Sequence, residues 1–307
     1  VFNSMFQITV TSFQCLMIED CEEKHLVNLF TWVNIAGLLS VFFAPLSTLF
    51  VSKYSLVPTV RMLYIIAFVF MTSKFIILYF SSKETRHGIK RMEETRNQSV
   101  WSLFLEYKQV FRKLFASRQM LLIMSIFVLI NISILTTGNF FSLYITQNLG
   151  IPEEYVPFFP IARSAIMLIF SFLLQPTINR LKYRPVMTWG FVLYIVSHVV
   201  LLLARPDNLI FVIGYTVIEA AAYALVIPRK DSLGALFIDK EDRARILGLI
   251  NVVVLAISAP FGTLIGWLSS INRQYPFILN IAIFTISALL VYSSKTISRY
   301  DSGDYAQ

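Results

Sequence analysis

Charged side chains are scarce in this sequence. Asp, Glu, Lys and Arg make up 14% of the 307 residues, against roughly 25% in a typical soluble domain. Apolar residues make up 56%, and Phe alone occurs 27 times. A soluble fold of this size cannot bury so much apolar surface, so a water-soluble enzyme is excluded. An intrinsically disordered chain is excluded as well, because disorder requires few apolar residues. The composition indicates a polytopic, all-α membrane protein.

Cysteine and histidine are scarce as well. The chain has two cysteines, Cys15 and Cys21, and three histidines that lie far apart. Two cysteines exclude a disulfide scaffold, and their spacing fits no zinc motif. The sequence also lacks a Ser–His–Asp grouping, an H-E-x-x-H motif and a phosphate-binding glycine loop. We therefore expect no catalytic residues, no metal site and no cofactor, and we expect that the protein is not an enzyme.

Long apolar runs recur along the chain, and crossing a bilayer takes about 20 residues. They are continuous rather than alternating, which favours helices over a β-barrel. Val1 already lies inside an apolar run, which predicts that the sequence is an N-terminally truncated fragment. The partial run is Val1–Ile18, and the complete runs are Leu26–Val51, Pro58–Phe80, Met120–Thr146, Tyr155–Ile178, Val186–Ala204, Leu209–Ile227, Ile246–Ser269 and Pro276–Tyr292.

Lys and Arg are unevenly divided between alternate loops. One side carries 20 of the 26, including those in 81–119 and in 229–245, whereas the loops of the other side carry three or four. Because basic loops stay on the cytoplasmic side, this side and the C-terminus are predicted to be cytoplasmic, in the plasma membrane. The same rule explains the net charge of +8, so no nucleic-acid partner is expected.

The polar segment 81–119 contains a second pattern. Between Ser99 and Arg118, apolar residues recur at helical spacing, with Lys108, Arg112 and Lys113 among them. This predicts a helix that lies on the inner membrane surface and binds anionic lipid. A cap packed on the cytoplasmic helix ends is a compatible alternative.

Two parts of the chain share one order of features. Ala44-Pro45 and Ala259-Pro260 each lie in a long apolar run. Each run is followed by a short loop, a second run, and then Ser81-Ser82-Lys83 or Ser293-Ser294-Lys295. Both copies run in the same direction across the membrane, which indicates a parallel repeat. If the repeat unit is six helices, the first unit has lost its first three and a half helices.

Two six-helix halves joined by a basic cytoplasmic linker resemble the major facilitator superfamily. Asn179, Arg180 and Arg184 resemble that family's basic gating loop, although the loop's usual acid and glycine are absent. The resemblance implies a polytopic helical bundle with the last two helices of the N-terminal half and the complete six-helix C-terminal half. The implied domains are the end of the N-terminal half, residues 1–80; a cytoplasmic linker, 81–119; and the C-terminal half with its tail, 120–307.

Two ionisable residues lie deep inside apolar runs. An ionisable group at the bilayer centre costs at least about 2.5–3.5 kcal/mol, so it marks a cavity or a pathway. Arg163 and Glu219 both lie roughly 12–16 Å from the outer side, so they can pair. Tyr215, Glu219 and Tyr223 share one helix face because they are four residues apart. We predict that these four residues line the substrate pathway. A buried ion pair that only fixes helix packing is the alternative.

Other polar residues in the runs are weaker candidates for the pathway. A helix–helix hydrogen bond is the alternative for each of them. They are Asn131, Asn139, Asn34 and Asn251.

The family resemblance implies a secondary active transporter. It would move a small solute by alternating access and be ion- or proton-coupled. The alternatives are a non-transporting scaffold or receptor on the same fold and, less favoured, a membrane-embedded lipid-modifying enzyme. The expected partners are a small-molecule solute and the lipid bilayer, with a monomer when the protein is full length.

Overall fold

The computed structural model describes residues 21–41, 53–84, 114–173, 181–206, 208–238 and 243–302, together with shorter stretches. Those stretches include 12–14, 16–18, 50–51, 88–89, 92–93 and 111–112. All regular structure in this part of the chain is helical. Within it, seven helices are long and apolar enough to cross a membrane. The predicted all-α, polytopic bundle is therefore confirmed.

The helices follow the predicted apolar runs in order and extend most of them by a few residues. The predicted surface helix between Ser99 and Arg118 and the partial run Val1–Ile18 lie mostly outside the described residues. The elements are η1 (Glu23–His25), α2 (Leu26–Val41), α4 (Leu56–Ser81), α7 (Arg118–Gln147), η2 (Glu153–Tyr155), α8 (Phe158–Leu173), α10 (Tyr183–Leu202), α11 (Leu209–Leu236), α12 (Arg243–Ile271), α13 (Tyr275–Ser293) and α14 (Lys295–Ser302).

Local sequence signals set several helix starts. The Ser117 hydroxyl accepts a hydrogen bond from the Met120 N–H at 3.4 Å at the start of α7. The Asn208 side chain does the same for the Ile210 N–H at 3.1 Å at the start of α11. Pro276 stands at the first positions of α13, where its missing N–H costs no helical bond. These caps satisfy backbone donors that have no partner within the helix.

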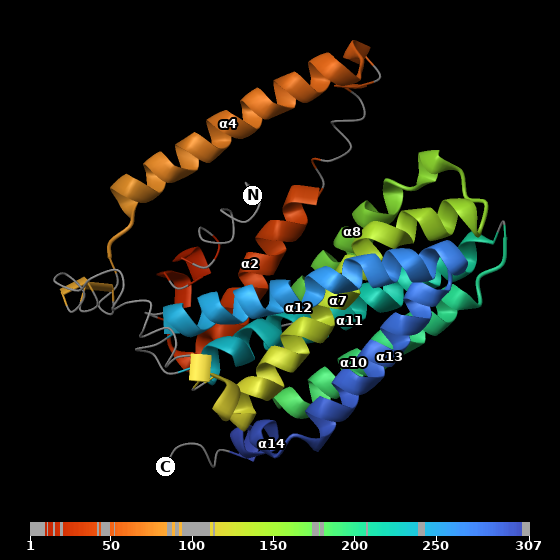
Figure 1. The fold of residues 1–307 in the computed structure, drawn as a ribbon. Coiled ribbons are helices and arrows are strands. Elements are labelled where there is room, and N and C mark those ends of the chain that lie inside the picture. The colour runs from red at the N-terminus through yellow and green to blue at the C-terminus, as the bar shows by residue number, and fades with distance from the viewer. Residues whose placement is uncertain are drawn as a thin grey trace.

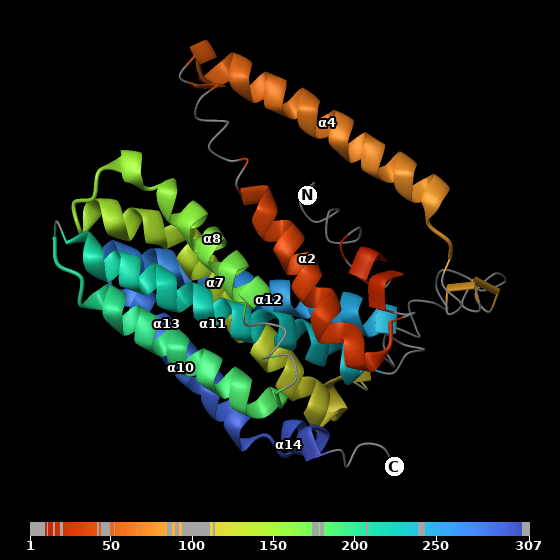
Figure 2. The same cartoon turned by 180° about the vertical axis from the view of Figure 1, so that it is seen from behind.

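Six helices, α7, α8 and α10 to α13, form one bundle, and α2 packs on α8 and α11 (Figures 1 and 2). Trp32 of α2 meets Phe172 of α8 edge to face, with ring centroids 6.2 Å apart. Helices α10 and α11 approach closely at Gly190, where a Cβ atom would lie 2.5 Å from Val226 Cγ2. Close packing of this kind at small residues is a main source of cohesion between helices in lipid.

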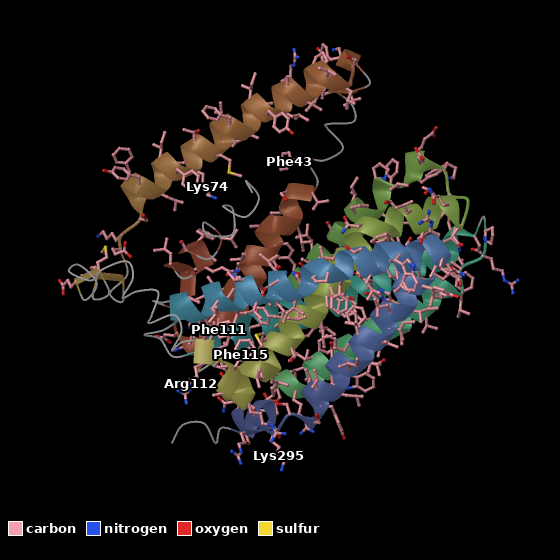
Figure 3. The ribbon with its side chains drawn as sticks, viewed as in Figure 1. Phe43, Lys74, Phe111, Arg112, Phe115 and Lys295 are labelled. Atoms are coloured by element: carbon pink, nitrogen blue, oxygen red, sulfur yellow. The ribbon has the colours of Figure 1, made fainter. Side chains whose placement is uncertain are left out.

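Helix α4 lies apart from the bundle in both views (Figures 1 and 2). Thr59 is the only buried residue among those of α4, and apolar side chains extend from the helix along its length (Figure 3). At 1.5 Å per residue its 26 residues span about 39 Å, more than the roughly 30 Å of a bilayer core. An exposed apolar helix of this length is suited to hydrocarbon rather than to water.

The short helix α14 closes one end of the bundle (Figure 1). The Asp301 carboxylate accepts hydrogen bonds from the Tyr183 and Arg184 N–H groups at 2.8 and 2.9 Å, so it caps α10 from another helix. The Tyr183 hydroxyl hydrogen-bonds to Ser232 of α11 at 2.8 Å, and the Arg184 guanidinium lies over the Tyr292 ring of α13 at 4.9 Å. Four helices are thereby tied together at this end.

The predicted end of α11 at Ile227 is wrong. The helix continues to Leu236 through Pro228, so Arg229 and Lys230 are helical and do not belong to a loop. Membrane helices tolerate an internal proline because neighbouring groups satisfy the backbone atoms that it frees. Arg229 is only 1% exposed, and it donates to the carbonyl oxygens of Ile178 at 2.5 Å and Leu225 at 3.4 Å.

Candidate functional site

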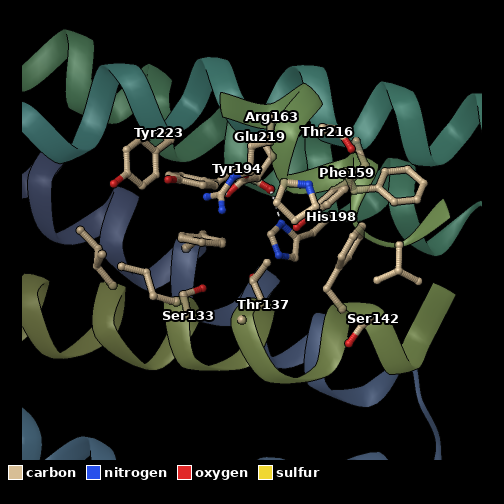
Figure 4. A pocket seen from close by; sticks show the side chains of 18 residues that line it. Ser133, Thr137, Ser142, Phe159, Arg163, Tyr194, His198, Thr216, Glu219 and Tyr223 are labelled. Atoms are coloured by element: carbon tan, nitrogen blue, oxygen red, sulfur yellow. Dashed lines mark hydrogen bonds and ion pairs between the residues drawn. The ribbon is translucent and has the colours of Figure 1, made fainter. Parts of the chain in front are cut away.

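A cavity of about 500 Å³ lies inside the bundle (Figure 4). Helices α7, α8, α10, α11 and α13 form its walls. Its volume and its largely apolar lining are typical of small-molecule sites. The lining residues are Ile130, Ser133, Ile134, Thr137, Gly138, Phe141, Ser142, Val156, Phe159, Pro160, Arg163, Tyr194, His198, Tyr215, Thr216, Glu219, Tyr223 and Phe284.

An ion pair between α8 and α11 forms part of the cavity wall. Arg163 Nη2 lies 2.6 Å from Glu219 Oε1, and Arg163 Nε lies 2.5 Å from Oε2. The Nη2–Oε1 contact is a hydrogen bond to a charged group, and the Nε–Oε2 contact adds a close ion-pair contact. The Glu219 side chain is 4% exposed, whereas that of Arg163 is 33% exposed. The carboxylate is therefore enclosed, and Arg163 is the more exposed half of the pair.

Tyr215 and Tyr223 lie one helical turn on either side of Glu219. The Tyr223 ring lies 5.3 Å from the guanidinium carbon of Arg163, within the range of a cation–π contact. Tyr215 stacks on Phe141 of α7, with centroids 5.3 Å apart. Figure 4 shows Glu219 and Tyr223 on the α11 side of the cavity, facing Ser133 and Thr137 of α7. The predicted amphipathic stripe of α11 therefore faces this cavity.

A second cluster of polar residues joins α10 to α13. His198 Nδ1 faces the Tyr194 carbonyl oxygen at 2.9 Å, and His198 Nε2 faces the Asn280 amide nitrogen at 3.1 Å. The same amide nitrogen lies 3.4 Å from the Thr137 hydroxyl of α7. His198 and Asn280 are at most 1% exposed. Three helices thus meet at one buried hydrogen-bonded cluster.

Sequence reasoning missed this cluster. None of His198, Thr137 and Asn280 is among the residues that the sequence predicts to line the pathway. The two residues that face each other, His198 and Asn280, are 82 positions apart, so no local spacing connects them. The available signal was a polar residue in each of two apolar runs, Val186–Ala204 and Pro276–Tyr292, which are not neighbours in the sequence.

Comparison with known proteins places this arrangement in a family. The family model for the Major Facilitator Superfamily matches residues 121–300, which is more than half of the chain. The chain belongs to the major facilitator superfamily. It is an integral membrane protein, and its family membership supports a membrane transporter rather than an enzyme.

Among solved structures, the chain resembles one described as "Crystal structure of a bacterial homologue of iron transporter ferroportin in outward-facing state". The TM-score is 0.62 at 14% identity, over 93% of this chain and 68% of that chain. At this identity the likeness shows a shared fold. No curated protein matches the chain.

The structure brings four of the predicted pathway residues together at the cavity: Arg163, Glu219, Tyr215 and Tyr223. Asn34 of α2 lies beside them. Its amide oxygen is 3.5 Å from the Tyr223 hydroxyl, and its amide nitrogen donates to the Phe30 carbonyl at 2.7 Å. Asn34 therefore extends the polar stripe toward α2.

The remaining predicted residues do not line the cavity. Asn139 is exposed and donates to the Leu135 carbonyl of its own helix at 2.8 Å. Asn131 and Asn251 are partly buried and lie outside the lining.

The residues that resemble the superfamily's gating loop are only partly described. Asn179 and Arg180 lie outside the described residues. Arg184 is in the first turn of α10, where its side chain donates to the Ser298 hydroxyl of α14 at 3.3 Å. In this structure Arg184 therefore belongs to the α14 end of the bundle.

Proposed function

We propose that this protein is a secondary active transporter that moves a small solute by alternating access, with the cavity as its solute site. One observation carries the proposal: two opposite charges, Arg163 and Glu219, meet in the wall of a cavity inside a bundle of membrane-length helices. Charges are costly at such a depth, and they are characteristic of substrate and ion pathways.

Glu219 is the proposed coupling group. A proton on its carboxylate removes one half of the ion pair and releases the Arg163 guanidinium for another ligand. Loss of that proton restores the pair and expels the ligand. The site therefore links the charge state of Glu219 to solute occupancy without a bound nucleotide or cofactor. A buried pair that fixes helix packing is the alternative that the test must exclude.

The similar solved structure is described as a bacterial homologue of the iron transporter ferroportin. A metal cargo fits this cavity poorly. The one carboxylate among the described lining residues is held by Arg163 at two points, and both His198 nitrogens face groups on the helices. We therefore propose an organic solute.

The wider organisation follows from the same family assignment. Residues 1–80 would belong to an N-terminal half, 81–119 to a cytoplasmic linker that binds anionic lipid, and 120–307 to the C-terminal half. The proposed location is the plasma membrane, with the basic loops and the C-terminus in the cytoplasm, and the full-length protein as a monomer. Figure 3 places Arg112 and Lys295 toward the α14 end of the molecule, as a basic cytoplasmic side requires.

Transport with the purified full-length protein tests the function. Proteoliposomes under an inward proton gradient receive a panel of labelled organic acids, amino acids, sugars and divalent metals. Wild-type protein should accumulate one organic solute. Glu219→Gln should abolish accumulation driven by the gradient, and Arg163→Ala should weaken solute binding.

The double variant Arg163→Ala/Glu219→Gln separates transport from packing. In a purely structural pair, each single change strands a buried charge at a cost of roughly 3–5 kcal/mol, and the double change restores the fold. A double variant that is stable but does not transport supports the proposal. A double variant that transports like wild type shows that the pair serves packing, and the site assignment then fails.

A further inference from the structure

The walls of the cavity are rich in aromatic rings. Tyr194 stacks on Phe284 at 4.3 Å between centroids, and Phe141 meets Phe159 edge to face at 5.7 Å. With Tyr215 and Tyr223, six rings from five helices line one cavity. Such walls offer flat apolar surface to a ligand and few hydrogen bonds. They favour a ligand body that is itself flat and apolar.

The charge that this cavity presents to a ligand is positive. Glu219 is enclosed and Arg163 is partly exposed, with side-chain exposures of 4% and 33%. The pair uses Nε and Nη2 of the guanidinium. Nη1 has no acceptor among the residues that the structure describes and can donate to a ligand. The Tyr223 ring under the guanidinium holds it in place.

Resting on the proposed function above, we propose that the substrate is an organic anion with an aromatic body, a carboxylate or similar group on a planar ring system. The anionic group binds the open edge of Arg163, and the rings of the substrate pack between Phe141, Phe159 and Tyr194. Since guanidinium and carboxylate match at two points, the anion competes with Glu219 for the same group. Protonation of Glu219 then favours anion binding.

A binding experiment that needs no transport tests this assignment. The probe is 1-naphthoate, with 1-naphthylmethylammonium as its cationic counterpart and Mn²⁺ as the metal. Affinity is measured by calorimetry on the purified protein in detergent, and thermal unfolding is recorded for each variant. Naphthoate should bind, and neither the ammonium compound nor Mn²⁺ should. Binding of either cation in preference to naphthoate, or no binding of naphthoate, overturns the assignment.

Two variants at the pair should act in opposite directions. Arg163→Gln removes the charged donor and should weaken naphthoate binding by at least about tenfold, the factor that one hydrogen bond to a charged group provides. Glu219→Gln removes the competing carboxylate and should tighten binding. General damage to the wall would weaken binding in both, and that result also overturns the proposal.

Arg273→Gln is the matched control. Arg273 lies in the turn before α13, donates to Ser269 at 2.8 Å, and does not line the cavity. This change should leave naphthoate affinity unaltered, and an equal loss in Arg273→Gln and Arg163→Gln would place the anion elsewhere. If Arg163→Gln unfolds, the uncharged pair Arg163→Gln/Glu219→Gln replaces it, and it should fold without binding naphthoate. Retained binding in that pair contradicts the assignment.

The outcome separates the two proposals. If naphthoate binding depends on Arg163 but proteoliposomes show no uptake, the anion site is supported and the transport function is contradicted. Uptake of a labelled solute that depends on the pair, without naphthoate binding, leaves transport standing and removes the anion assignment.

Discussion

His198 and Asn280 hold each other between two helices, and each is at most 1% exposed. The contact joins His198 Nε2 of α10 to the Asn280 amide nitrogen of α13 at 3.1 Å. Asn280→Leu leaves the histidine nitrogen unpaired, and we expect a loss of about 1–2 kcal/mol in unfolding free energy. Thermal unfolding in detergent measures it.

Thr285→Val on the same helix is the control for Asn280. Thr285 is exposed and donates only to the Ile281 carbonyl of its own helix at 2.8 Å, so its change should stay within about 0.5 kcal/mol. Equal stability of both variants would show that the buried cluster contributes nothing to the fold.

At the residue scale, the sequence predicted the charged site residues but not the uncharged polar ones. Arg163 and Glu219 stand out because each interrupts an apolar run, and their depths can be counted in residues. A lone asparagine or threonine in a membrane helix carries no such signal, since most of them bond to the preceding turn, as Asn139 does. The partners of His198 are fixed by how α10 and α13 are rotated against each other, which helix periodicity alone does not define.

The α10–α11 contact depends on one missing side chain. A Cβ atom at Gly190 would meet Val226 Cγ2 at 2.5 Å and Leu225 Cβ at 3.2 Å, both close to the α11 backbone. Gly190→Ala should therefore push the helices apart and cost about 1–3 kcal/mol. Gly262 has no atom within 4 Å of its Cβ position, so Gly262→Ala should be neutral or stabilising by up to about 1 kcal/mol. Unfolding midpoints of the two variants compare them directly, and a harmless Gly190→Ala would contradict the close packing.

The α14 cap is a separate prediction about an element. Asp301 provides a charged acceptor for two N–H groups at the start of α10, where the helix dipole also favours a negative charge. Asp301→Ala should cost about 0.5–2 kcal/mol and should speed hydrogen exchange at the Tyr183 and Arg184 amides. Asp301→Asn keeps an oxygen acceptor, so its stability should fall between that of the wild type and that of Asp301→Ala. Unchanged exchange in Asp301→Ala would show that the cap has no role.

Helix boundaries illustrate why the sequence predicts an element better than its end. Proline and arginine at 228 and 229 suggest that the apolar run stops at Ile227, yet α11 continues to Leu236. The carbonyls that accept the Arg229 guanidinium come from its own helix and from residue 178. The contact with residue 178 therefore allows the Arg229 charge to be buried. Counting apolar residues along the sequence does not reveal such a contact.

For the molecule as a whole, the predicted orientation in the membrane is directly measurable. In a background with Cys15 and Cys21 replaced by Ser, single cysteines at Glu153 and Arg205 should react with a membrane-impermeant thiol reagent in intact cells. Cysteines at Arg96, Lys182 and Lys240 should react only after the cells are opened, because basic loops remain inside. External labelling at Lys182 would overturn the order of spans.

The overall fold was predictable because composition and run length are properties of the whole chain. The seven long apolar helices of the described residues, and their order along the chain, follow from hydropathy alone. The cavity does not, since it depends on how far five helices stand apart, which is set by side-chain packing such as that at Gly190. Only for α11 did the sequence indicate which face of the helix points inward, because Tyr215, Glu219 and Tyr223 are spaced four residues apart.

The packing of α2 has an optical consequence. Trp32 of α2 lies 6.2 Å from the Phe172 ring of α8. Helix α2 belongs to the proposed N-terminal half and α8 to the proposed C-terminal half, so the indole lies where the proposed alternating access would move the two halves against each other. Indole emission changes wavelength and intensity with its surroundings. The chain's own fluorescence at Trp32, isolated by replacing its three other tryptophans with Phe, would thus report the conformational cycle without any attached dye.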